Sequence, residues 1–173
     1  MRVLENLNKY KVVLASNSPR RKELLQRLGI NFKIRTLLGV DESYPDTLCG
    51  EEVARYISNK KAEAYKASMG PDELLITADT IVCLDGSVLG KPYDEQGARD
   101  MLSKLSGRTH QVVTGVTVVT ENRKESFSVT SHVTFARLTK DEIDYYVENY
   151  LPFDKAGAYG IQEWIGLVAV EEL

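Results

Sequence analysis

Cysteine and histidine are scarce in this chain, since its 173 residues include only two of each. Cys49 and Cys83 have no partner motif around them, so the sequence predicts neither a disulfide framework nor a thiolate metal site. With only His110 and His132 available, a histidine-rich zinc site is not expected either. Any metal site in this protein is therefore expected to use oxygen ligands.

Long apolar runs are also missing. Nowhere do about 18 apolar residues run together, and residues 1–6 lack the apolar core and cleavage pattern of a signal peptide. From these two observations we expect a cytoplasmic protein without a membrane partner.

An excess of positive charge is absent, because the formal net charge is −3. The chain as a whole has no general attraction for a polyanion, so nucleic acid is not an expected partner and any phosphate must be bound by a local cluster.

The 173 residues, 43% of them hydrophobic, are enough for one well-cored domain or for two lobes that share a sheet. Since no repeat, low-complexity tract or linker interrupts the chain, we predict a single domain over residues 1–173.

What the chain does contain is a basic motif near its start. It has, in order, a buried strand, a helix N-cap, a proline at the first helical position and a glycine just past the helix end: Val12–Ala15, Ser18, Pro19 and Gly29. Arg20, Arg21 and Lys22 occupy the first turn, where the helix dipole disfavours cations. The motif therefore predicts a site for a phosphate-like anion, with a solvated basic turn as the alternative.

Hydrophobic spacing and turn residues predict the other elements. A helix is expected over residues 51–68, with Val53, Ile57 and Ala64 on one side. Two further helices should begin after Asp94 and at the Thr139–Glu142 capping box. Strands are expected over residues 32–38, 74–84, 87–89, 110–120 and 125–135, with a tight hairpin at 85–86. This mixture of elements predicts an α/β fold with a mixed twisted sheet and flanking helices.

Asp79 is the only charged residue in an otherwise apolar predicted strand. A buried carboxylate is costly unless it is paired, hydrogen-bonded or bound to a metal, so we interpret Asp79 as a site residue. The alternative is an aspartate that hydrogen-bonds backbone at a strand edge. Simple pairing across the hairpin puts Lys91 opposite Thr80 and diagonal to Asp79. Because strict pleating would place Lys91 and Asp79 on opposite faces, a bulge or the strand end must bring them together if they cooperate.

Glu42 and Lys61 are informative only together with the other charged residues. Glu42 and Asp79 could hold a divalent ion through carboxylate oxygens, while a polyphosphate would be neutralised by Arg20, Arg21, Lys61 and Lys91. The common nucleotide motifs are absent, since Gly90-Lys91 is followed by Pro92 and no Gly-x-Gly-x-x-Gly occurs. The Gly-x-Ser-x-Gly elbow of serine hydrolases is missing as well.

Seven separated segments resemble, in order and spacing, the Maf family of nucleoside triphosphate pyrophosphatases. The likeness covers nearly the whole chain, and its segments are residues 14–21, 40–42, 61–62, 78–82, 90–92, 105–110 and 154–162. It implies two lobes around a cleft, as in inosine triphosphate pyrophosphatase. It also implies a magnesium- or manganese-dependent hydrolysis of a nucleoside triphosphate to the monophosphate and pyrophosphate.

The resemblance further implies a role for each matching residue. Asp79 would accept the proton of the attacking water, with Glu42 assisting at the metal. The phosphates would be bound by Ser16, Arg20, Lys61 and Lys91. Base choice would depend on Arg21, Thr80 and Gln162, a combination similar to the subfamily that acts on dTTP and UTP; the branch that favours 7-methyl-GTP often has Trp in place of Arg21. A homodimer is implied as well.

One departure from the family pattern concerns the C-terminal end. Family members usually continue after the Ile161–Gln162 region with a strand, a Gly-Ser-Tyr-like segment and a Gly-Leu-Pro turn before a last helix. Here only residues 167–173 follow Gly166. Either the chain is truncated or an internal stretch is absent, and the loss of a strand would weaken the second lobe or the cleft. An inactive relative that keeps the fold but lacks this segment is therefore one alternative to the hydrolase. Another is a non-catalytic nucleotide- or nucleic-acid-binding regulator of septum formation, although the acidic balance argues against a nucleic-acid surface.

Overall fold

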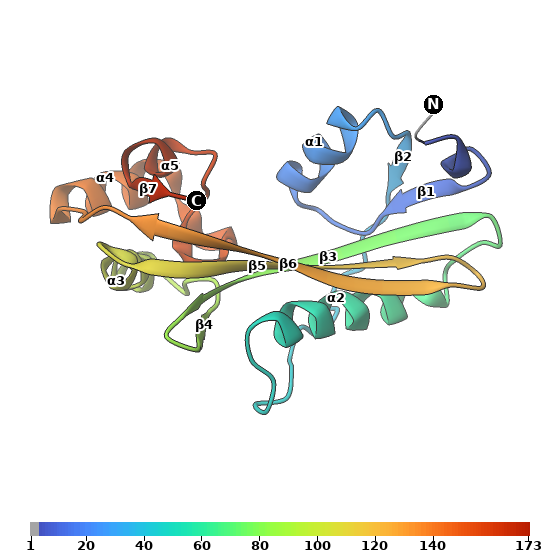
Figure 1. Ribbon diagram of the computed structural model, residues 1–173, viewed down its shortest axis with the longest axis horizontal. Helices are drawn as coiled ribbons and strands as arrows, with labels where there is room; N and C mark the ends of the chain where they lie inside the picture. Colours follow the sequence, from blue (N-terminus) through green and yellow to red (C-terminus); the bar gives the residue numbers. More distant parts are fainter. Residues whose placement is uncertain (1–3) are drawn as a thin grey trace. The chain divides into compact units, whose positions relative to one another are not determined.

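The computed structural model describes residues 4–173, which form two compact units. Unit 1 comprises the described residues up to Leu48 together with Glu52–Asp79 and Gly115–Ser128. Unit 2 comprises Cys49–Glu51, Thr80–Thr114 and Val129–Leu173. Over the same described residues a seven-stranded sheet has the order β2-β1-β3-β5-β6-β7, with β4 paired to β3 (Figure 1). The sheet combines parallel and antiparallel pairs and is flanked by helices, which confirms the predicted mixed α/β fold.

Three strands contribute residues to both units. They are β3 (Glu73–Leu84), β5 (Thr109–Val119) and β6 (Lys124–Phe135). The chain passes from unit 1 to unit 2 within β3, directly after Asp79. The long hairpin of β5 and β6 has its tip in unit 1 and its strand ends in unit 2.

Unit 1 is built on parallel pairing. After a short 3-10 turn (Glu5–Leu7), β1 (Lys11–Leu14) pairs in parallel with both β2 (Phe32–Ile34) and β3, and α1 (Pro19–Arg27) connects β1 to β2. Helix α2 (Glu51–Lys66) runs along the sheet (Figure 1). Its Ala62 and Tyr65 pack in one apolar cluster with Val13, Ala15, Leu75 and Val119.

A glycine sets how closely α2 approaches the sheet. A Cβ atom added to Gly115 of β5 would lie 2.3 Å from the backbone carbon and oxygen of Ala54. Ala54 itself is fully buried in α2. Only a residue without a side chain allows the two backbones this contact, so Gly115 fixes the position of the helix that carries Lys61.

Unit 2 has the larger apolar core. The hairpin at Asp85 and Gly86, both with positive φ, leads into β4 (Ser87–Leu89). The remaining elements are α3 (Glu95–Leu105), α4 (Lys140–Tyr150), two 3-10 turns (Pro152–Asp154 and Ala156–Ala158), α5 (Trp164–Val168) and β7 (Val170–Glu172). Residues from β3, α3, β6, α4 and α5 meet in one cluster around Leu102, Phe135 and Tyr146.

Most predicted helix ends are confirmed. Asp94 accepts a hydrogen bond from the Gly97 N–H at 2.7 Å, and Thr139 and Glu142 form the capping box at the start of α4. Ser18 stands at the N-cap position of α1, but its side chain makes no capping bond within the described chain. Its backbone N–H instead donates to Ser16 Oγ at 3.2 Å, so the hydroxyl of Ser16 organises this loop.

Two element predictions were wrong in detail. The strand expected to reach residue 38 ends at Ile34, because the chain then leaves the sheet and the Leu37 N–H donates to the Tyr65 hydroxyl of α2 at 2.7 Å. Ala64 is exposed rather than part of the buried side of α2. The buried face is centred on Ala54, Ser58 and Tyr65, and Ala64 lies at its margin.

Candidate active site

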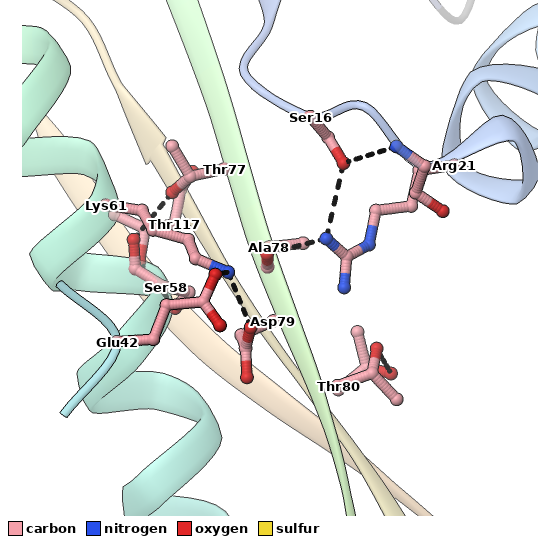
Figure 2. Close-up of polar contacts among 12 residues, drawn as sticks. Ser16, Arg21, Glu42, Ser58, Lys61, Thr77, Ala78, Asp79, Thr80 and Thr117 are labelled. Atoms are coloured by element: carbon pink, nitrogen blue, oxygen red, sulfur yellow. Dashed lines mark hydrogen bonds and ion pairs between the residues drawn. The ribbon is translucent and has the colours of Figure 1, made fainter. Parts of the chain in front are cut away.

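Lys61 of α2 joins two carboxylates in unit 1. Its Nζ lies 2.6 Å from Asp79 Oδ1 and 2.9 Å from Glu42 Oε1 (Figure 2). The side chains of Lys61 and Asp79 are 14% and 12% exposed, whereas that of Glu42 is 48% exposed. Three residues that are far apart in the sequence, from the 39–50 loop, α2 and β3, thus meet at one polar centre.

Burial makes the Asp79 carboxylate more basic than an exposed one. Desolvation raises its pKa above the ordinary value, and the charge of Glu42 acts in the same direction. Lys61, through its charge and its hydrogen bond, and Arg21 oppose this rise. Asp79 is buried, as its place in an apolar strand predicts, and its partner is Lys61; its role as a site residue stays a prediction. A carboxylate with a raised pKa is a better proton acceptor than an exposed one.

On the other side of β3, Arg21 lies close to the same strand. Its Nη1 donates to the Ala78 carbonyl oxygen at 2.7 Å and to Ser16 Oγ at 3.4 Å (Figure 2). Desolvation lowers the pKa of the Arg21 guanidinium, and the neighbouring charge of Arg20 lowers it further. The β1–α1 loop and the first turn of α1 therefore bring Ser16 and Arg21 next to Ala78, the residue that precedes Asp79, with Arg20 close enough to Arg21 to affect its pKa.

A network of buried hydroxyl groups lies between α2 and the sheet. Thr77 Oγ1 donates to the Ser58 carbonyl at 2.7 Å, and the Ser58 and Thr117 hydroxyls are 3.0 Å apart. The Thr117 hydroxyl is in turn 2.9 Å from Ser126 Oγ. Sequence reasoning did not find this network, because serine and threonine in β-strands are common and only the fold shows which of them face a helix. It ties α2 to β3 and β5 close to Lys61 and Asp79.

The other predicted site residues belong to unit 2. Thr80 follows Asp79 in β3, and its hydroxyl is 3.0 Å from that of Thr114. Lys91 is exposed and lies beyond the last paired residue of β4, Leu89, which pairs with Val82. Gln162 is exposed in the turn that precedes α5.

Two buried titratable residues of unit 2 were not predicted to matter. His110 Nε2 is 2.7 Å from the Tyr159 hydroxyl, and burial lowers the pKa of His110 to about 4. Lys155 is 7% exposed and pairs with Asp154 at 2.8 Å and with Glu163 at 3.2 Å. Lys155 follows directly after Asp154 in the sequence, but nothing in that pattern indicated that its side chain would be buried.

The carboxylates of unit 1 are compatible with a hard divalent cation. No group of three or more His, Cys, Asp and Glu side chains within residues 4–173 could hold a metal ion. Glu42 and Asp79 nevertheless converge on one cation, the Lys61 ammonium, and so present a pair of oxygen donors to the same point. Mg²⁺ is commonly bound by one or two carboxylates together with substrate phosphates, so this pair fits the ion without a complete protein cage.

Comparison with known proteins gives consistent matches over the chain. A sequence profile described as "Maf-like protein" matches residues 11–173. A dTTP/UTP pyrophosphatase of Phocaeicola vulgatus is 61% identical over 97% of this chain and 87% of its own length. A dTTP/UTP pyrophosphatase of Bacteroides thetaiotaomicron is 57% identical over 99% of this chain and 89% of its own length. Among solved structures, a HAM1 protein from Coxiella burnetii is 15% identical with a TM-score of 0.48, covering 92% of this chain and 91% of that one.

Proposed function

Because the chain belongs to the Maf family, we propose that it is a nucleoside triphosphate pyrophosphatase that prefers dTTP and UTP. The reaction releases the nucleoside monophosphate and pyrophosphate, and it would remove these nucleotides from the cytoplasmic pool. The observation that carries the proposal is the buried Asp79 carboxylate, which shares the Lys61 ammonium with Glu42. Relatives more than half identical over nearly the whole chain carry the name dTTP/UTP pyrophosphatase.

In this proposal Asp79 orients the attacking water and accepts its proton. Its raised pKa suits that task, because an acceptor whose pKa is closer to the working pH takes a proton more readily. Before the reaction the Lys61 ammonium, 2.6 Å from Asp79, favours the ionised carboxylate that can accept a proton, and its flexible side chain can also turn toward a substrate oxygen. Glu42 and Asp79 would hold a bound Mg²⁺ or Mn²⁺, which supplies charge neutralisation at the phosphates when present.

Phosphate binding is assigned to Ser16, Arg20, Lys61 and Lys91. Ser16 and Arg20 come from the loop and first turn of α1, where backbone N–H groups and the helix dipole also favour an anion. Base selection is assigned to Arg21, Thr80 and Gln162. An amide such as that of Gln162 offers both a donor and an acceptor, as a pyrimidine edge requires.

A substrate panel tests the proposed reaction. Purified protein with Mg²⁺ or Mn²⁺ is incubated with dTTP, UTP, CTP, dATP, GTP and 7-methyl-GTP, and both pyrophosphate and monophosphate are measured. Release mainly from dTTP and UTP is the expected result. Absence of release from every nucleotide, with retained nucleotide binding, would overturn the proposal and favour a binding-only protein.

Asp79→Asn tests the assigned proton acceptor. The variant should lose at least about a thousandfold in kcat, because the amide cannot accept the proton of the attacking water. Asp41→Asn is the matched control: Asp41 lies in the same loop as Glu42 and pairs with Lys60 at 2.6 Å, but its side chain is 65% exposed. Full activity of Asp79→Asn would show that another group accepts the proton.

A further inference from the structure

Lys60 and Lys61 bind neighbouring acids of one loop in two different environments. Lys60 Nζ contacts Asp41 Oδ2 at 2.6 Å and the Ser43 carbonyl at 3.0 Å, at an exposed position. Lys61 Nζ contacts Glu42 and Asp79, and its side chain is 14% exposed. Both lysines therefore attach the 39–50 loop to α2, but only Lys61 reaches the buried carboxylate.

Lys61 stands at the point on which two carboxylates converge. Glu42 and Asp79 both contact the Lys61 ammonium directly, and the charge of Arg21 also acts on both carboxylates. An ammonium nitrogen 2.6 and 2.9 Å from two carboxylate oxygens occupies the space where an ion ligated at about 2.1 Å by the same oxygens would sit. A divalent ion and the ammonium cannot both be there, since they would clash and repel each other.

We propose that Lys61 acts as a resident cation that keeps the metal site closed until substrate arrives. In the nucleotide-free protein the ammonium competes with a divalent ion for Glu42 and Asp79. When a triphosphate binds, its oxygens offer Lys61 a new partner, and the flexible four-carbon side chain can move to them. The two carboxylates are then released for the metal, so metal and nucleotide bind with positive coupling. This inference rests on the proposed function for the identity of the site, but it concerns binding and not turnover.

The first experiment measures Mn²⁺ binding to nucleotide-free protein by electron paramagnetic resonance. Lys61→Met should bind Mn²⁺ at least about tenfold more tightly than the unmodified chain, because it removes the competing charge and leaves both carboxylates. Lys60→Met is the matched control, since it loosens the same loop without freeing Asp79, and its affinity should stay within about threefold of the unmodified chain. Lys61→Arg keeps the positive charge and should also leave the affinity low.

Several results would overturn the proposal. One is that Lys61→Met binds Mn²⁺ no more tightly than the unmodified chain. Another is that the Lys60→Met control gains as much Mn²⁺ affinity as Lys61→Met. Adding Asp79→Asn to Lys61→Met should abolish the gain, and a gain that persists would place the ion elsewhere. If Lys61→Met is poorly folded, its thermal midpoint should rise with Mn²⁺ more than that of the unmodified chain, and an equal or smaller rise contradicts the proposal.

The outcome separates the resident cation from the proposed reaction. Tighter Mn²⁺ binding in Lys61→Met together with no hydrolysis by the unmodified chain would keep the competition and reject the pyrophosphatase. Hydrolysis of dTTP together with unchanged Mn²⁺ binding in Lys61→Met would keep the pyrophosphatase and reject the competition.

Discussion

The two units bury ionisable groups in different surroundings. Unit 1 places an ion pair, Lys61 with Asp79, and a hydroxyl network next to a small apolar cluster. Unit 2 has a larger apolar cluster and also buries a lysine, Lys155, between Asp154 and Glu163. Its buried His110 meets the Tyr159 hydroxyl instead of a charge. In unit 2 the carboxylates of Asp154 and Glu163 are 66% and 27% exposed, whereas Asp79 in unit 1 is 12% exposed. The carboxylate proposed to react is therefore the one of the three that has lost the most contact with water.

The largest expected effect tests how unit 1 is assembled. Gly115→Ala should lower the free energy of unfolding by about 3 kcal/mol or more, because the new methyl group would overlap the Ala54 backbone. Urea unfolding, followed by circular dichroism, measures the free energy of unfolding of each variant. Gly70→Ala is the control within unit 1: its Cβ would be 3.7 Å from the flexible Glu73 side chain, and it should change stability by less than about 0.5 kcal/mol. Equal costs for the two variants would contradict the close packing of α2.

The second prediction concerns unit 2 and acid pH. Burial lowers the pKa of His110 to about 4 from 6.5, so the unfolded chain binds a proton that the folded chain rejects between those values. Stability should consequently fall as pH decreases through this range, by about 2 kcal/mol between pH 7 and 4.5 from His110 alone. Urea titrations at each pH measure the free energy of unfolding. Over the same pH interval, the value for His110→Gln should fall by about 2 kcal/mol less than that for the unmodified chain. An identical pH dependence in both chains would show that His110 is not buried in the neutral form.

The smallest predicted effect concerns Asp79 of unit 1, and its dependence on pH has the opposite sign to that of His110. The raised pKa of Asp79 means that its folded carboxyl holds a proton better than the unfolded one, so its contribution to stability is lost as pH rises. Asp79→Asn should therefore be slightly more stable than the unmodified chain at pH 7, because the amide carries no charge to desolvate and Lys61 keeps Glu42 as a partner. The gain should disappear as pH falls toward the ordinary aspartate pKa. A less stable Asp79→Asn at pH 7 would show that the ion pair outweighs desolvation.

Local patterns predicted most of the helices and strands correctly. Caps at Asp94 and Thr139 and the turn at Asp85–Gly86 depend on a few adjacent residues, so the sequence shows them directly. The early end of β2 could not be predicted from adjacent residues. It depends on the Tyr65 hydroxyl, which reaches the Leu37 N–H only after α2 has packed on the sheet.

For the candidate site, the sequence alone predicts which residue is a buried charge but not which side chains contact it. Asp79 is visible as one charge in an apolar strand, and the structure confirms that it is buried and paired. Lys61 lies at helical spacing from the buried Ala54, Ser58 and Tyr65, so it is a lysine on the inner face of α2. That spacing indicates an inward-facing cation, but it cannot identify Asp79 and Glu42 as its partners, because both contacts depend on the tertiary fold.

The path of the chain through β3, β5 and β6 limits how this protein can be divided. Each unit is assembled from separate stretches of sequence, so no single cut by a protease and no simple truncation releases either unit intact. Exchange of unit 1 between two relatives by recombination would likewise require several crossovers, one of them at the peptide bond between Asp79 and Thr80. A proposed proton acceptor and a proposed specificity residue are therefore inherited as neighbours, although they belong to different units.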